Sequence, residues 1–250
     1  MDGIILIDKP SGWTSFDVVA KVRGMIRRET GQKSAGRRTK VGHTGTLDPL
    51  ATGLLVLVVG KYTKLVPELS KADKTYEVTM KLGETSTTGD EEGEKTKVSD
   101  AHPSIGQVIE ALEQFVGEIE QVPPAYSAVK VNGQRAYKLA RAGKEVKIEP
   151  RKVKIYEIKP GHKIDKNNTE GRTLDRSWYA YPEVRFTVKV SSGTYVRTLV
   201  EDLGTKLGTG AYMTVLRRTE VGEFNLGQSL GMENLSIDKV AEHLKVDKQD

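Results

Sequence analysis

The chain has 250 residues, of which 37% are hydrophobic and 29% are charged, so it carries enough apolar material for a folded core. Cysteine is absent, which excludes disulfides, thiolate metal sites and cysteine nucleophiles. The net charge of +5 favours a polyanionic partner without proving one.

The predicted elements are strands and helices in mixed order. Apolar runs and alternating patterns predict strands at 3–8, 54–59, 75–82, 152–158 and 184–190. Apolar residues at helical spacing predict helices that include 18–26, 105–115, 196–207 and 237–244. Thr14 and Asp17 have the spacing of a helix-starting box before the first of these helices. Without a regular strand–helix alternation, the pattern favours an α+β fold, with a mixed, largely antiparallel sheet and flanking helices.

Basic residues gather in two parts of the chain. Residues 23–40 include seven basic side chains against Glu29 alone, and their second part, 29–40, is predicted to be a basic loop. A second basic segment, about 124–152, suits contacts with phosphates, although a solvated loop has the same composition. The stretch 161–181 is polar and without period, which indicates an insertion. The candidates for contacts with a nucleic-acid backbone in the second segment are Lys130, Arg135, Lys138 and Arg141.

Several kinds of chemistry are excluded by missing motifs. The sequence has no phosphate-binding loop, no dinucleotide fingerprint and no Gly-x-Ser-x-Gly. Its four histidines lack metal-ligand spacing, so we expect neither a metal nor a cofactor. The apolar run near the N-terminus is too short for a signal peptide, and no stretch approaches the roughly 20 apolar residues of a membrane span. We therefore expect a cytoplasmic protein.

One segment, 42–53, places Asp48 and His43 among three glycines and one proline. Such a backbone is tight and irregular, and the segment precedes the most apolar run of the chain. A carboxylate on a rigid loop at the edge of the core is in a usual position for a catalytic group. The alternative is that Asp48 caps a turn before Pro49, and local physics alone slightly favours it.

A second candidate group follows the strand predicted at 184–190. Tyr195 and Arg197 lie two residues apart at the end of a strand and so share a side. Arg197 has apolar neighbours, and a half-buried guanidinium needs a carboxylate partner. Asp48 is one candidate, and Glu201, one helical turn later, is the other. Position alone does not decide between them.

At these segments the chain closely resembles the TruB-type tRNA pseudouridine-55 synthases, in their bacterial stand-alone form. The signature loop of that family, Gly-His-x-Gly-x-Leu-Asp-Pro-x-Ala-x-Gly, fits residues 42–53 throughout. The resemblance runs from about Gly3 to about Phe224. Further matching segments, in chain order, are Asp8-Lys9-Pro10-x-Gly12, Asp73-Lys74-Thr75-Tyr76, Gln121-x-Pro123-Pro124-x-Tyr126-Ser127-Ala128, Gly193-Thr194-Tyr195-Val196-Arg197-Thr198 and Leu216-Arg217-Arg218.

The resemblance implies three catalytic residues. Asp48 would be the essential carboxylate and would act at the sugar as nucleophile or as base. Tyr76 would stack against the target base, and Arg197 would pair with Asp48.

The resemblance also implies residues that bind the substrate. His43 would assist the flipped nucleotide, and Tyr195 and Leu216 would line the uracil pocket. Lys9 would support the site from the neighbouring strand.

The implied domain is a pseudouridine synthase catalytic fold over 1–228, with 229–250 as a short helical tail. The small C-terminal RNA-binding domain of bacterial relatives is expected to be missing. The implied substrate is the T-arm of tRNA, clamped by the segment near 124–152. The protein would act as a monomer without an obligatory protein partner.

The implied reaction suits a chain without cofactors. It breaks the N1–C1′ bond of uridine and joins C5 to C1′, so no redox step and no external group enters. A carboxylate near C1′ resembles the groups that act in glycoside cleavage, and the uridine must leave its stack to reach it. Three rival functions remain: a tRNA-binding folding chaperone, a guide-dependent subunit of a larger particle, and a small-molecule lyase or glycosidase.

Overall fold

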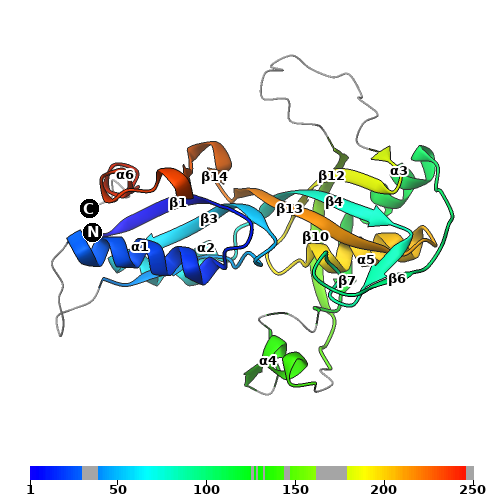
Figure 1. Cartoon of the computed structure of the whole chain (residues 1–250), viewed down its shortest axis with the longest axis horizontal. Helices are drawn as coiled ribbons and strands as arrows, with labels where there is room; N and C mark the ends of the chain where they lie inside the picture. The colour runs from blue at the N-terminus through cyan, green and yellow to red at the C-terminus, as the bar shows by residue number, and fades with distance from the viewer. Residues whose placement is uncertain are drawn as a thin grey trace, which may run out of the picture. The chain divides into compact units, whose positions relative to one another are not determined.

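The structure is a computed structural model in which two compact units can be described separately (Figure 1). Unit 1 comprises Met1–Tyr76 and Leu216–Asp250, and unit 2 comprises Glu77–Val215. Two strands, β4 and β13, belong partly to each unit. The described residues are 1–29, 39–124, 127, 129–131, 133–143, 147–161 and 179–245. Most of the predicted basic loop 29–40 and of the predicted insertion 161–181 therefore lies outside them.

Unit 1 is built on a sheet with the strand order β15-β1-β3-β13. β1 and β3 pair antiparallel from Gly3 opposite Val59 to Lys9 opposite Gly53. β15 lies parallel to β1, β13 lies parallel to β3, and β2 and β14 pair antiparallel with β3 and β13. The bounds are β1 Gly3–Lys9, β2 Val41–His43, β3 Thr52–Val59, β13 Ala211–Val221, β14 Phe224–Asn225 and β15 Leu230–Gly231.

Both faces of this sheet are buried, which explains why the run 54–59 is apolar without alternation. On one face α1 packs its buried residues, such as Val18 and Val22, onto Ile5 and Leu55, and α6 joins the same cluster through Val240. On the other face the cluster includes Ile4, Leu6, Val56, Val58, Tyr62, Val221 and Phe224. The helices of unit 1 are α1 Ser15–Glu29, η1 Gly60–Leu65, α2 Val66–Leu69, η3 Leu226–Gln228, η4 Met232–Asn234 and α6 Ile237–Glu242.

Unit 2 is built on strands in the order β13-β4-β12-β10-β7. β10 pairs antiparallel with β12 on one side and with β7 on the other. Two small hairpins, β5–β6 and β8–β9, stand apart from this sheet. The strands are β4 Lys74–Leu82, β5 Glu84–Ser86, β6 Lys95–Lys97, β7 Gly117–Gln121, β8 Lys130–Val131, β9 Gln134–Arg135, β10 Arg151–Pro160, β11 Tyr179–Ala180 and β12 Glu183–Val190, and the helices are α3 Ile105–Gln114, α4 Ala136–Arg141 and α5 Val196–Lys206.

The predicted α+β fold with a mixed, largely antiparallel sheet is confirmed. The five predicted strands lie within β1, β3, β4, β10 and β12, and the four predicted helices correspond to α1, α3, α5 and α6. The predicted box at the start of α1 is also confirmed, because Asp17 N–H donates to Thr14 Oγ1 (3.1 Å) and Thr14 N–H donates to Asp17 Oδ2 (2.9 Å).

β13 is the long strand that the sequence pattern did not predict. Two adjacent arginines, Arg217 and Arg218, interrupt its apolar alternation, yet Arg218 is only 2% exposed. No helix in the described residues is long and apolar enough to cross a membrane.

Candidate active site

Asp48 lies on the loop between β2 and β3, where it is partly exposed. The turn that it begins is closed by the main chain, because Ala51 N–H donates to the Asp48 carbonyl oxygen (3.1 Å). Leu47, the residue before it, is 3% exposed. The backbone of Asp48 is therefore fixed on one side by buried Leu47 and on the other by the hydrogen-bonded turn to Ala51.

Ser15, the first residue of α1, fastens the loop on one side of Asp48. Its Oγ accepts a hydrogen bond from Leu47 N–H (2.8 Å) and donates one to the Leu47 carbonyl oxygen (3.0 Å). The serine is 2% exposed, so these bonds lie away from water. Removing the hydroxyl would leave two main-chain groups of Leu47 without this partner, which is costly in a buried place.

Lys9, at the end of β1, fastens the loop on the other side. Its Nζ donates to the carbonyl oxygens of Trp13 (2.6 Å), Pro10 (2.9 Å) and Pro49 (3.3 Å). The side chain is fully buried, and burial lowers its pKa to about 8, an effect that the negative charge of Asp48 opposes. Lys9 and Asp48 therefore interact electrostatically within unit 1.

Arg218, on β13, holds the loop near its ends. Its Nε donates to the Leu54 carbonyl oxygen (2.8 Å), and its Nη2 donates to the Gly45 carbonyl oxygen (3.0 Å). Gly53 makes the close approach of β3 to β13 possible: its φ is +98°, and a Cβ there would stand 2.2 Å from the Arg218 carbonyl oxygen. Sequence reasoning assigned no role to Arg218. The available signal was its place in the matching segment 216–218, two residues after Leu216, because residues i and i+2 of a strand lie on the same face.

The other predicted residues of unit 1 lie on strands. His43 ends β2 and is half-buried, and Tyr76 on β4 is 9% exposed. Leu216 on β13 is 8% exposed, and its carbonyl oxygen accepts a hydrogen bond from Thr52 Oγ1 (3.5 Å). Unit 1 therefore carries five of the predicted site residues, and their roles at a substrate stay predictions.

Arg197 belongs to unit 2, in the first turn of α5, and its side chain is 8% exposed. Its Nη1 lies 3.4 Å from Asp90 Oδ2 and donates to the Thr88 carbonyl oxygen (3.2 Å). Glu201 is one of the two partners that the sequence suggested. Burial raises the pKa of the Glu201 carboxyl, and the positive charge of Arg197 opposes this effect only in part. The pairing with Asp48 stays a prediction, since the two residues belong to different units.

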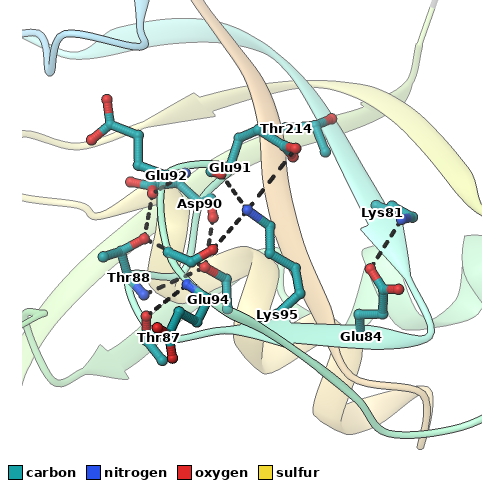
Figure 2. A network of polar contacts seen from close by, with 12 residues as sticks. Lys81, Glu84, Thr87, Thr88, Asp90, Glu91, Glu92, Glu94, Lys95 and Thr214 are labelled. Atoms are coloured by element: carbon teal, nitrogen blue, oxygen red, sulfur yellow. Dashed lines mark hydrogen bonds and ion pairs between the residues drawn. The ribbon is translucent and has the colours of Figure 1, made fainter.

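Asp90 is a buried carboxylate that sequence reasoning missed. Figure 2 shows Thr88 and Glu92 on one carboxyl oxygen: Thr88 Oγ1 donates to Asp90 Oδ1 (2.5 Å), as does Glu92 N–H (3.1 Å). Asp90 is 5% exposed, so it is an unusual member of an acidic run. The sequence Asp90-Glu91-Glu92 is typical of a solvated turn, and only the fold shows that its first residue faces inward.

Tyr195 is held at the start of α5 by a buried glutamine. Gln121 Oε1 accepts from Tyr195 N–H (3.0 Å), and Gln121 Nε2 donates to the Tyr195 carbonyl oxygen (3.3 Å). The guanidinium carbon of Arg151 lies 6.0 Å from the Tyr195 ring centroid. The ring is therefore partly exposed next to a cation, on a fixed backbone.

The predicted basic clamp can be followed only in part. Lys138 is exposed on α4, while the side chains of Lys130, Arg135 and Arg141 lie outside what the structure describes. Among the described residues there is no group of acidic, histidine or cysteine side chains suited to a metal ion.

Comparison with known proteins places the chain in a family. The model of the TruB family pseudouridylate synthase N-terminal domain matches residues 32–196. A protein named tRNA pseudouridine synthase B from Thermobifida fusca is 44% identical over 95% of this chain and 75% of its own length. One of the same name from Clostridium acetobutylicum is 44% identical over 99% and 77%. The chain thus spans about three quarters of these relatives.

Solved structures give the same result at greater distance. The structure of a Cbf5-Nop10-Gar1 complex matches with a TM-score of 0.63 and 30% identity, over 93% of this chain and 53% of that chain. The archaeal box H/ACA sRNP Nop10-Cbf5 complex matches with a TM-score of 0.61 and 25% identity, over 96% and 57%. The chain therefore spans little more than half of those chains.

The fold and these similarities define a pseudouridine synthase. Within that class the chain belongs to the TruB family, as its loop at 42–53 predicted, and it isomerises uridine in tRNA to pseudouridine.

A further match requires one correction at the C-terminal side. The model of the tRNA pseudouridylate synthase B C-terminal domain matches residues 197–248. The expectation that the C-terminal family domain is missing is not supported by this match. A domain boundary at residue 228 stays a prediction.

Proposed function

We propose that the chain converts the uridine at position 55, in the T-loop of tRNA, to pseudouridine, with Asp48 as the catalytic carboxylate. The observation that carries this proposal is the fastening of Leu47 and Pro49, the two neighbours of Asp48, by Ser15 and Lys9. A catalytic group must be held well within about 1 Å of its productive position, because a misplacement of about 1 Å can lower the rate 100-fold.

The reaction needs a carboxylate at the sugar and a way to retain the detached base. Asp48 either attacks C1′ or removes a proton from the sugar, the N1–C1′ bond breaks, the retained uracil turns, and a C5–C1′ bond forms. The proton on C5 leaves at the end, and N1 carries a proton in the product. Tyr76 stacks on the uracil, a contact worth about 1–3 kcal/mol per base, and Arg197 pairs with Asp48.

The remaining predicted residues bind the RNA in this proposal. His43 supports the flipped nucleotide, and Tyr195 and Leu216 line the uracil pocket. Lys9 acts through the loop rather than on the substrate. The backbone of the T-arm is held by the segment near 124–152, through Lys130, Arg135, Lys138 and Arg141.

The enzyme acts as a monomer in the cytoplasm, without a guide RNA or an obligatory protein partner. Its relatives with 44% identity are named as tRNA enzymes. The neighbours that form complexes with Nop10 and Gar1 are more distant, with 25–30% identity. The identity gap supports the stand-alone form.

The test measures tritium release from bare tRNA labelled at uracil C5, with no guide RNA present. We expect release with the wild type and at least 1,000-fold less with Asp48→Asn, which still folds and binds tRNA. Asp17→Asn is the matched control, since the charge of this aspartate, like that of Asp48, raises the pKa of Lys9, while its carboxylate accepts hydrogen bonds from Thr14 at the start of α1. Its release should stay near wild type.

Each other outcome would contradict one part of the proposal. Equal release by wild type and Asp48→Asn would refute the role of Asp48. Release that persists when position 55 is changed to cytidine would refute the target. Binding without release by the wild type would favour a chaperone or a guide-dependent subunit.

A further inference from the structure

The outer face of α1 has a composition that its packing does not explain. The inner face is buried in the core through residues such as Val18, Val22 and Ile26. The outer face carries Phe16, which is 63% exposed, the highest value among the exposed large hydrophobic residues in the described part of the chain. Arg23 is exposed on the same helix. A single exposed hydrophobic side chain is common on protein surfaces, so Phe16 gains significance only from the cations on the same side of the helix.

The aromatic and basic residues of this face form a line. Phe16, Arg23 and Arg27 are seven and four residues apart, spacings that return to the same side of a helix. The guanidinium carbon of Arg23 lies 5.7 Å from the Phe16 ring centroid. At a rise of about 1.5 Å per residue the line is about 16 Å long, roughly the length of five stacked nucleotides.

The line begins beside the Asp48 loop. Ser15, the residue before Phe16, is the one that bonds both main-chain groups of Leu47. The first turn of α1 is thus close to the loop, and in our proposal the nucleotides next to the one at Asp48 follow the helix from there toward Arg27.

A simpler explanation covers only part of this pattern. Basic residues in the last turn interact favourably with the helix dipole, which accounts for Arg27 and Arg28. It does not account for Arg23 in the middle of the helix, and it does not account for Phe16. An aromatic platform followed by a row of cations is the arrangement that binds single-stranded nucleic acid, with bases on the ring and phosphates on the cations.

We propose that Phe16, Arg23 and Arg27 form a binding surface for the RNA strand that flanks the target uridine. Phe16 stacks on one base next to the target, and the two arginines contact phosphates further along. The proposal adds a second RNA contact, on unit 1, to the predicted clamp on unit 2. It rests on the proposed placement of the target nucleotide at Asp48.

The first experiment compares two double variants of equal charge change. Arg23→Gln with Arg27→Gln removes two cations from the α1 face. Lys64→Gln with Lys71→Gln removes two exposed cations of unit 1 near η1 and α2, whose apolar residues pack on the opposite face of the sheet. Thermal unfolding first confirms that both variants are folded.

We expect the arginine variant to raise KM for tRNA about 10-fold with kcat unchanged at saturation. The slope of log Kd against log salt should fall by about 1.5, because each lost phosphate contact lowers it by about 0.7–0.9. The lysine variant should match the wild type in both quantities. Equal effects of the two variants would reduce the proposal to net charge, and no effect of either would overturn it.

The second experiment tests the aromatic platform. Phe16→Ala should weaken tRNA binding about 10-fold at every salt concentration, whereas Phe16→Tyr should bind as the wild type does. Unchanged tRNA binding by Phe16→Ala would overturn the platform, and gel filtration in which the wild type self-associates but Phe16→Ala does not would assign the face to a second copy of the chain instead. Because binding is measured separately from tritium release, an inactive wild type would refute the proposed function and leave this test intact.

Discussion

Replacing Ser15 with alanine should separate the positioning of Asp48 from the binding of tRNA. The hydroxyl makes two hydrogen bonds to Leu47, of 2.8 and 3.0 Å, and it touches the loop on the side that precedes the aspartate. Alanine removes both bonds and adds no new atoms, so the change is confined to the fastening of the loop.

The expected magnitude follows from burial. A buried hydrogen bond contributes about 1 kcal/mol, and a buried main-chain group without its partner costs about 1–3 kcal/mol. Ser15 is 2% and Leu47 is 3% exposed, so we expect the free energy of unfolding to fall by about 2–4 kcal/mol. If the loop relaxes by about 1 Å, kcat falls about 100-fold, while Kd for tRNA stays within two-fold.

The assay combines urea unfolding, single-turnover tritium release and filter binding of tRNA. Thr14→Ala is the control, because it removes the cap of the same helix without a contact to Leu47. It should cost about 1 kcal/mol in stability and leave kcat unchanged. If Ser15→Ala keeps the wild-type kcat, or if Thr14→Ala loses as much activity, the loop is not positioned through this hydroxyl and the reasoning fails.

Three further changes test the scaffold. In urea unfolding, Gly53→Ala should destabilise by several kcal/mol more than Gly12→Ala: both have positive φ, which costs about 1–2 kcal/mol, but only the first meets backbone within 4 Å. Asp90→Asn should cost about 3–5 kcal/mol in the same assay because it breaks the buried pair with Arg197. Burial lowers the pKa of Lys74 from 10.5 to about 8, so the folded state holds fewer protons than the unfolded chain between these values. Wild-type stability relative to Lys74→Met should then rise across that range, by at most about 1.4 kcal/mol per pH unit, in unfolding experiments at several pH values.

Local patterns were sufficient for the elements whose burial is simple. The apolar run 54–59 reads as a strand because both of its faces are covered, and α1 reads as a helix because one face is apolar at helical spacing. The dense glycine and proline content of 42–53 marked a fixed loop. In each case the residues within one segment carry the signal.

The contacts that fasten the candidate site were not predictable in this way. Ser15 and Leu47 are 32 residues apart, and Arg218 and Gly45 are 173 apart. A serine at the start of a helix reads as a cap, and an arginine in a strand reads as exposed. Only the pairing of β3 with β13 shows that the Arg218 guanidinium donates its hydrogen bonds to main-chain carbonyl oxygens.

If Asp48 reacts as proposed, the bonding partners of the buried cations would let the loop keep its backbone fixed during the reaction. Lys9 and Arg218 donate to carbonyl oxygens on either side of Asp48, at Pro49 and Gly45, and therefore fix the backbone. Ser15 Oγ likewise donates to the carbonyl oxygen of Leu47, the residue before Asp48. Carbonyl oxygens keep their bonding capacity whether the nearby carboxylate is ionised, protonated or bonded to a sugar. In the proposed reaction, a clamp that depended on the Asp48 carboxylate would loosen at the step in which that carboxylate reacts, whereas a clamp on its neighbours would hold throughout.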